Sequence, residues 1–130
     1  MKKPMSNLTY ISPFFMVANL ENSLAFYVDK LGFKVLFTGP DDDPFFAIVG
    51  RDNISLMLKA AGEPVPNHTR HEWARWDAFI HTVDPGILFE EYSRVGATFH
   101  QPLKIDGDGL FGFEIEDADG YILFFGRPNT

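Results

Sequence analysis

Residues 24–35, LAFYVDKLGFKV, decide the fold of this chain, because the same pattern returns at residues 88–99, LFEEYSRVGATF. In both stretches, apolar residues at helical spacing lead through a tyrosine to a glycine, and an apolar strand follows. A helix that ends at a glycine and leads into a strand is a common local signal. Its recurrence indicates two copies of one structural unit.

Capping residues mark where each helix begins. Asn19 is predicted to accept hydrogen bonds from the free backbone amides of the first helix, which ends at Gly32. Asp84 followed by Pro85 begins the second helix, which ends at Gly96. The first helix is expected to bury one face, formed by Leu20, Leu24, Tyr27 and Leu31.

Strands are predicted on both sides of each helix. They fall at residues 10–19, 33–37, 45–50 and 53–59 in the first copy, and at residues 76–83, 97–103, 109–116 and 120–126 in the second. The chain is therefore predicted to be one α+β domain, 1–130, with tandem βαβββ modules at 8–60 and 77–127 and a connector at 61–76 that contains one helical turn. One helix covers only one face of each sheet. Two modules, of one chain or of two, would close the bare faces into a cavity.

Composition excludes several classes of function. The 18 acidic and 11 basic residues give a net charge of −7, which disfavours a nucleic-acid partner. The chain has no cysteine, no apolar run near the ~20 residues of a membrane span, and no apolar run after the two lysines of residues 1–7. A soluble, cytoplasmic protein with neither nucleic acid nor membrane as partner is expected. Aromatic residues make up 15% of the chain, which suggests a ring-lined pocket or interface.

Residues 17–33, 83–99 and 117–126, the last reading DADGYILFFG, resemble the signature segments of the vicinal oxygen chelate superfamily. That superfamily includes glyoxalase I, extradiol dioxygenases, fosfomycin-resistance enzymes and bleomycin-resistance proteins. The resemblance covers about residues 8–127 and implies tandem βαβββ modules in a half-open barrel, a homodimer, and a ligand cavity on the concave side. It does not fix one activity, because this fold hosts several chemistries.

The resemblance also implies four inward-facing positions at which enzymes of the superfamily hold a divalent metal. In this chain they are occupied by Ser12, Met57, Ala78 and Phe124. A hydroxyl, a thioether and two hydrocarbon side chains do not make a site for Mg²⁺, Mn²⁺, Fe²⁺ or Zn²⁺. A register change of one residue brings in only Asp77 as a plausible ligand. We therefore expect no metal and no other cofactor, and the serines lack the partner histidine of a catalytic nucleophile.

The histidines and an acidic cluster supply further polar groups. His68 and His71 lie in the connector and are interpreted as parts of a solvated loop, and the three aspartates at residues 41–43 as a turn. His81 is expected to be a half-buried structural histidine, and His100 has no evident partner in the sequence. The sequence does not fix a role for any of the four histidines.

Strand alternation and the resemblance together predict which residues line the ligand cavity. They are Phe14, Met16, Met57, Trp73, Trp76, Ala78, Glu114, Ile122 and Phe124. The two tryptophans either form a lid or pack under a loop, and Glu114 is either a buried anion or an exposed carboxylate on an edge strand. A ring-lined cavity with few acids suits a small flat or cationic organic molecule.

The chain resembles most the bleomycin-resistance branch, whose members bind a drug without altering it. The sequence therefore favours a non-catalytic protein for resistance or sequestration, with a small organic ligand and a homodimeric state. Two alternatives stay open. One is a metal-dependent lyase, isomerase or dioxygenase with unusual ligands such as Asp77, His81 or Glu114; the other is a dimeric regulatory module whose cavity is filled by its own phenylalanines.

Overall fold

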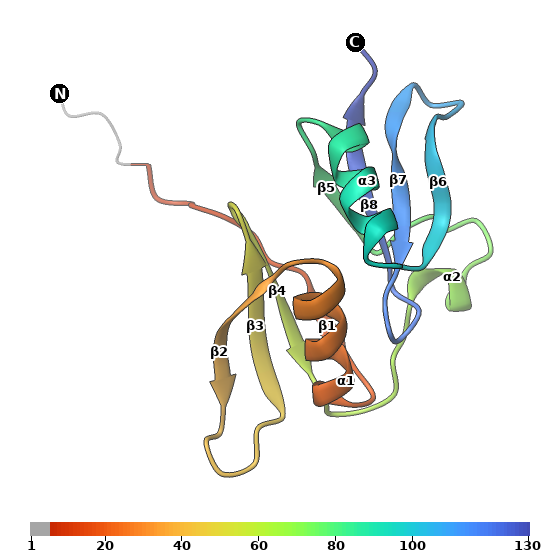
Figure 1. The fold of residues 1–130 in the computed structure, drawn as a ribbon. Helices are drawn as coiled ribbons and strands as arrows, with labels where there is room; N and C mark the ends of the chain where they lie inside the picture. Colours follow the sequence, from red (N-terminus) through yellow and green to blue (C-terminus); the bar gives the residue numbers. More distant parts are fainter. Residues whose placement is uncertain (1–5) are drawn as a thin grey trace, which may run out of the picture.

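The computed structural model describes residues 6–130 (Figure 1). The expectation that the chain begins without a targeting segment concerns residues 1–5, which lie outside the described part. The elements follow one another as β1 (Phe14–Met16), α1 (Leu20–Ala25), the π-helical η1 (Phe26–Lys30), β2 (Lys34–Gly39), β3 (Phe46–Arg51), β4 (Ile54–Lys59), α2 (Asn67–Arg70), β5 (Ala78–His81), α3 (Pro85–Arg94), β6 (Phe99–Ile105), β7 (Leu110–Glu116) and β8 (Ile122–Pro128). No helix between residues 6 and 130 is long and apolar enough to cross a membrane.

The strands form two four-stranded sheets, and each sheet has its own helix (Figure 1). The strand order is β1-β4-β3-β2 in the first sheet and β5-β8-β7-β6 in the second. In each sheet the first strand runs parallel to the last, and the other pairs are antiparallel. The predicted α+β class and the tandem βαβββ arrangement are confirmed.

Both helices begin and end where the sequence predicts. The side chains of Asn19 and Asp84 each accept a hydrogen bond from the backbone N–H three residues later, at 2.9 and 3.2 Å. Gly32 and Gly96 both have a φ of 73°, a left-handed conformation that costs a glycine little. These local signals therefore fix the two elements that cover the sheets.

The first strand of each sheet is shorter than predicted. Strand β1 begins only after Pro13, which has no N–H to donate to a ladder and contributes its carbonyl oxygen to the N–H of Met57 at 2.9 Å. Strand β5 is limited to Ala78–His81, where residues 76–83 are predicted. Both strands lie at a sheet edge, so each has only one neighbouring strand to extend its pairing.

One hydrophobic core joins the two modules. It lies between the helices and the covered faces of the sheets, and it contains residues of both modules. Phe15 of β1 stacks on Tyr121, with ring centroids 4.3 Å apart. The hydroxyl of Tyr92 on α3 donates to the carbonyl oxygen of Leu31 at 3.0 Å. The modules therefore pack through their helix-covered sides, which leaves the other face of each sheet open.

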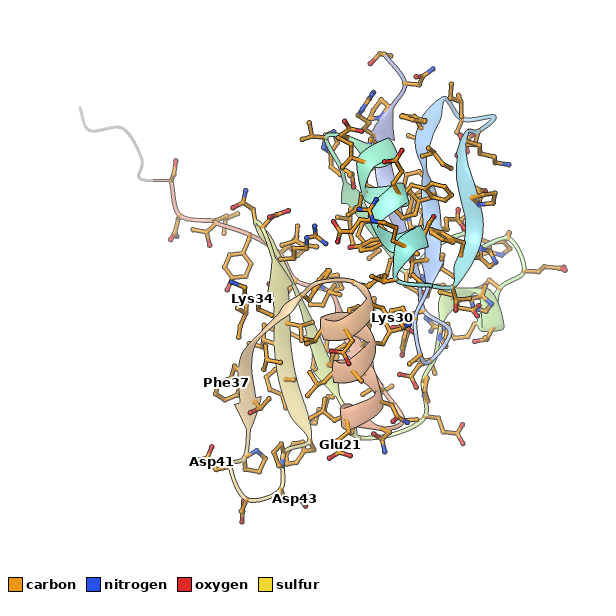
Figure 2. The ribbon with its side chains drawn as sticks, viewed as in Figure 1. Glu21, Lys30, Lys34, Phe37, Asp41 and Asp43 are labelled. Carbon is orange, nitrogen blue, oxygen red and sulfur yellow. The ribbon has the colours of Figure 1, made fainter. Side chains whose placement is uncertain are left out.

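Charged side chains also connect the modules. Arg51, at the end of β3, donates two hydrogen bonds to the carboxylate of Glu91 on α3, at 2.6 and 2.9 Å. Lys30 lies on the side of the first helix that faces the second module (Figure 2) and donates to the carbonyl oxygen of Val95 at 2.8 Å. Both contacts are partly exposed, so we expect each to contribute modestly to stability.

The turn at residues 117–120 is the buried part of this junction. The carboxylate of Asp117 accepts the backbone N–H groups of Asp119 and Tyr121, both at 2.9 Å, and the hydroxyl of Tyr27 at 2.6 Å. Asp119 in turn accepts the hydroxyl of Ser23 at 3.2 Å. Burial raises the pKa of Asp117 to about 6. The two carboxylates of this turn thus join the second module to the first helix.

Candidate ligand-binding site

The open face of the first sheet is apolar and partly exposed. Phe14 of β1 is 54% exposed, whereas the next residue, Phe15, is buried against the helix. Met57 of β4 pairs with Phe14 and therefore lies on the same face. Met16 lies two residues beyond Phe14 and shares that face. The structure thus brings together three of the residues predicted to line the cavity.

A hollow of about 430 Å³ extends across this face. Its lining consists almost wholly of rings and hydrocarbon: Phe14, Phe37, Gly39, Pro40, Phe45, Phe46 and Lys59. Phe37 lies on β2 at the outer edge of the first module, away from the second module (Figure 2). The Nζ atom of Lys59 lies 5.7 Å from the ring centroid of Phe45. The hollow therefore offers exposed aromatic faces, one of which already holds a cation.

The loop beside this hollow carries the acidic cluster. Asp41 and Asp43 lie at its tip and point away from the sheet (Figure 2). All three aspartates of residues 41–43 are exposed, and their backbone forms a turn. The prediction that this cluster is a solvated turn is confirmed.

The open face of the second sheet is covered by its own rings. Phe124 and Ile122 alternate with core residues of β8, so they lie on the face away from α3, yet both are fully buried. Phe79 stacks on Phe124 with centroids 5.2 Å apart, and Trp76 packs against Phe124 at 4.8 Å. A molecule on this face therefore meets Phe79, which is 41% exposed, before it meets the two predicted residues of β8.

Two glycines set the position of the Phe124 ring. Gly112 and Gly126 face each other across β7 and β8. A Cβ atom at Gly112 would lie 2.9 Å from the Phe124 ring, and one at Gly126 would lie 2.5 Å from it. The Phe124 ring therefore lies flat over the glycine backbone, and Phe79 and Trp76 pack on it. We call these three side chains the aromatic layer.

Glu114 lies beside this aromatic layer as a buried carboxylate, which settles the choice between its two predicted positions. Only 4% of its side chain is exposed. It accepts hydrogen bonds from Arg75 at 3.2 Å and from Nδ1 of His100 at 2.7 Å. The amide nitrogen of Gln101, which pairs with Glu114, is buried and has no hydrogen-bond partner among the described residues. The Glu114 carboxylate is therefore held by two side chains, one from the connector and one from β6.

Two predictions about β5 are wrong. Ala78 is predicted to line the open face, but it belongs to the core on the helix-covered face. Because side chains alternate along a strand, its neighbours Asp77 and Phe79 are the ones on the open side. His81 is exposed, where a half-buried histidine is predicted. It pairs with Gly126, which has no side chain to cover the imidazole.

Three connector and edge-strand residues also differ from expectation. His68 lies on the short helix α2, and its Nε2 bonds to the carbonyl oxygen of Gly120 at 2.8 Å, so it is not part of a solvated loop. His71 is exposed, as predicted, and stacks on Trp73 at 4.8 Å. Trp73 is itself 76% exposed, so of the two tryptophans only Trp76 covers the sheet. His100 has a partner after all, the carboxylate of Glu114.

The residues present do not fit the divalent metal that the fold family implies. On the first sheet the implied positions carry the hydroxyl of Ser12, which bonds to Ser55 at 2.6 Å, and the thioether of Met57. Asp77, the ligand that a register change would supply, accepts backbone N–H groups with both oxygens, at 2.8 and 2.9 Å. Within residues 6–130, no three histidine, aspartate or glutamate side chains gather as a metal site.

A larger hollow, of about 670 Å³, lies where the modules meet, between the β3–β4 hairpin and the start of α3. Three of its charged groups are already engaged. Arg51 is bonded to Glu91, and the Asp84 carboxylate caps α3. We therefore assign this hollow to the junction and place the candidate site on the open faces of the sheets.

Two βαβββ modules in tandem are the fold of glyoxalase-like proteins. The model of the Glyoxalase/Bleomycin resistance protein/Dioxygenase superfamily matches residues 8–125, and the chain belongs to this superfamily. The resemblance noted in the three signature segments is thereby confirmed. No curated protein matches the chain.

Solved structures of several bacterial proteins share the fold. The bleomycin-binding protein of bleomycin-producing Streptomyces verticillus, solved with copper(II)-bleomycin, is 25% identical, with 93% of this chain and 97% of that one covered and a TM-score of 0.69. TioX from Micromonospora sp. ML1 is 20% identical, with 89% and 96% covered and a TM-score of 0.70. The bleomycin resistance determinant encoded on transposon Tn5 is 20% identical, with 93% and 98% covered and a TM-score of 0.71. At 20% identity the last two support the fold alone.

Proposed function

We propose that this protein binds a small flat or cationic organic molecule and sequesters it without chemical change, as bleomycin-resistance proteins do. The observation that carries the proposal is the exposed aromatic face of the first sheet. Phe14, Phe37 and Phe45 are 54%, 52% and 43% exposed, and they line one continuous hollow. Similarity to a protein solved with copper(II)-bleomycin supports this choice of ligand class.

Exposed aromatic side chains that line one continuous hollow favour association with a second apolar surface. Burying a phenylalanine side chain contributes roughly 1.5–3 kcal/mol, so rings left half in water retain a substantial drive to associate. We propose that a second copy of the chain supplies this second surface, with the ligand held between the first sheet of one copy and the second sheet of the other. The aromatic layer of Trp76, Phe79 and Phe124 would then form the opposite wall.

The chemistry of the two walls fits a flat or cationic ligand. Ring faces contribute about 0.5–1.5 kcal/mol for each stacked aromatic group, and about 0.5–2 kcal/mol for a cation placed over a ring. Lys59 over Phe45 and Arg75 over Trp76 already use the second kind of contact within the protein. The same ring faces would accept a cationic group of the ligand.

Two of the three residues considered for catalysis, Asp77 and Glu114, are bonded to other protein groups, which supports binding without turnover. Both carboxylate oxygens of Asp77 are occupied by backbone N–H groups of Asn67 and Ile122. His81 is exposed beside the module junction, where it lines the larger hollow together with Asp84. Asp77, His81 and Glu114 do not gather as a metal site in the described chain.

Calorimetric titration with metal-free bleomycin tests the proposal. Wild type should bind one molecule per protomer, and Phe14→Ala should weaken binding about tenfold, which corresponds to about 1.4 kcal/mol. Val83→Ala is the matched control, because Val83 is 84% exposed but lies at the module junction; it should bind as wild type does. Bleomycin binding that Phe14→Ala leaves unchanged would contradict the proposed face. Absence of binding to bleomycin, and to ethidium as a second flat cation, would overturn the function.

The dimeric state is tested separately by sedimentation velocity. We expect a dimer at micromolar concentration. Phe37→Glu should shift it towards monomer, because the substitution places a charge on the apolar face that the second copy would cover. The exposed substitution Val28→Glu, on the first helix, is the control and should leave the dimer unchanged. A wild-type chain that stays monomeric at these concentrations would refute the proposed cover.

A further inference from the structure

The side chain of Arg75 makes the contacts that a bound cationic ligand would make, with an aromatic ring and with carboxylates. It lies at the end of the connector, immediately before Trp76. Its guanidinium carbon is 4.6 Å from the centroid of the Trp76 ring. Its Nη2 donates to Glu114 at 3.2 Å and to Asp106 at 3.1 Å, and its Nη1 donates to Asp108 at 3.0 Å. An aromatic face beside a carboxylate is the combination that recognises a planar, delocalised cation.

The three carboxylates around Arg75 differ in what they lose when the guanidinium moves away. Glu114 is buried, with 4% of its side chain exposed, so leaving its carboxylate without a nearby cation is costly. Asp106 has 9% of its side chain exposed, but it keeps the backbone N–H groups of Asp108 and Leu110 as partners. Asp108 has 73% of its side chain exposed and is solvated with or without a partner. Arg75 can therefore turn outwards and keep Asp108 as a partner, whereas Glu114 then needs a replacement cation in addition to His100.

The place where this replacement would occur belongs to the open face of the second sheet. Glu114 pairs directly with Phe124 across β7 and β8. Trp76 packs on Phe124 and thus connects the guanidinium position to the aromatic layer. A ligand with a ring and a terminal cation would therefore lay its ring on the layer of Phe79 and Trp76 while its cation reached Glu114.

We propose that Glu114 and Trp76 form a cation subsite, which Arg75 fills in the free protein and from which a ligand carrying a planar amidinium or guanidinium group displaces it. This inference rests on the proposed ligand-binding function and narrows its ligand class. A planar cation is favoured over an ammonium group because it can lie flat on the indole ring while its N–H groups point at the carboxylate.

Benzamidine is a suitable probe, because it joins an amidinium group to one aromatic ring, and neutral benzamide is its matched uncharged analogue. If Arg75 occupies the subsite about nine-tenths of the time, its removal raises the apparent affinity for a competing cation about tenfold. Calorimetry should therefore show about tenfold tighter binding of benzamidine to Arg75→Ala than to wild type. Glu114→Gln in the Arg75→Ala background should abolish this gain.

Two controls isolate the subsite. Benzamide should bind Arg75→Ala and wild type equally. Arg70→Ala removes a cation from the same connector, an exposed arginine that bonds to Asn67, and should bind benzamidine as wild type does. An unchanged benzamidine affinity in a folded Arg75→Ala protein, or an equal gain for benzamide, would overturn the proposal.

A measurement on the otherwise intact site covers the case in which Arg75→Ala does not fold. The chain has two tryptophans, and Trp73→Phe leaves only Trp76. The tryptophan fluorescence of this variant therefore reports on the subsite alone. Benzamidine should change this emission and shift the side-chain Nε–H resonance of Arg75, whereas benzamide should do neither. No shift at saturating benzamidine would refute the displacement. If neither bleomycin nor ethidium binds while benzamidine does, the proposed drug-sequestering function is refuted and the subsite is left intact; the reverse result would refute the subsite alone.

Discussion

The hydrogen bond between Tyr27 and Asp117 is the contact through which the module junction can be tested most directly. Tyr27 is fully buried, and its hydroxyl donates to the carboxylate at 2.6 Å. Tyr27→Phe removes the hydroxyl and leaves the buried carboxylate of Asp117 with one hydrogen bond fewer. A hydrogen bond to a charged group contributes roughly 1.5–3 kcal/mol, so we expect the free energy of unfolding to fall by about 2 kcal/mol at pH 7.5. For a chain of this size that lowers the melting temperature by about 7 °C.

The loss should depend on pH in a direction that follows from Asp117. Burial raises the pKa of this carboxyl to about 6. A group whose pKa is higher in the folded protein than in the unfolded chain contributes its full stability below the unfolded pKa, about 3.9, and loses it as the pH rises through the folded pKa. Above pH 6 the Tyr27 hydroxyl therefore offsets part of the cost of a buried charge. Near pH 4.5 it bonds a neutral carboxyl, which lowers the expected loss to about 1 kcal/mol.

Urea unfolding measures both values. One fixed protein concentration is used, because the stability of the dimer proposed above would depend on protomer concentration. Tyr10→Phe is the matched control: Tyr10 is 74% exposed, and its loss of a hydroxyl should change stability by less than about 0.5 kcal/mol. The reasoning is refuted if Tyr27→Phe is as stable as Tyr10→Phe at pH 7.5. It is equally refuted if the gap between them widens as the pH falls from 7.5 to 4.5.

Three further outcomes are expected. Gly112→Ala should lower stability by about 2 kcal/mol or more, because the new Cβ would lie 2.3 Å from a backbone oxygen; Gly107→Ala, with nothing within 4 Å, should be neutral in the same thermal melt. Arg51→Met and Glu91→Gln in a double-mutant cycle should give a coupling of about 1 kcal/mol. The hydrogen bond with Arg51 lowers the pKa of Glu91, so this coupling is fully present above the usual glutamate pKa and is lost as the pH falls through the lowered pKa of the folded protein. Protein purified without chelator should contain far less than one equivalent of Mn, Fe, Ni or Zn by elemental analysis; a stoichiometric metal would contradict the donor chemistry.

The two helices and the strand β8 were predictable because their signals are local. Each signal acts only on the helical turn next to it: the cap at Asn19, the glycine at Gly32 and the proline at Pro85. On β8, alternation places Phe124 on the face away from the helix regardless of what covers it. The sequence does not reveal the cover itself, Trp76 and Phe79, because it arises from segments that are distant in the chain.

Local sequence signals do not predict the orientation of the β5 side chains or the contacts of Glu114 with His100 and Arg75. Residues 78–81 read AFIH and carry apolar side chains on both faces, so alternation does not say whether Ala78 or Phe79 points to the open side. The pairing of β6 with β7 shifts register twice, and this irregular pairing brings His100 to Glu114. Arg75 reaches the same carboxylate from the connector, a contact that only the tertiary fold creates.

The acidic turn at residues 117–120 illustrates why residue type alone is a poor guide to chemistry in this fold. Asp117 has its two oxygens bonded to two backbone N–H groups and a buried tyrosine hydroxyl, so a metal or a substrate would have to break that set and leave the groups unpaired. The bonds also fix where β8 begins, and thereby hold Phe124 over its glycines. Glu114 is the contrasting case, because one of its partners is the side chain of Arg75, which also donates to Asp106 and Asp108. A carboxylate bonded by backbone amides serves the fold, whereas one bonded by a side chain that can leave is the one we expect to meet a ligand.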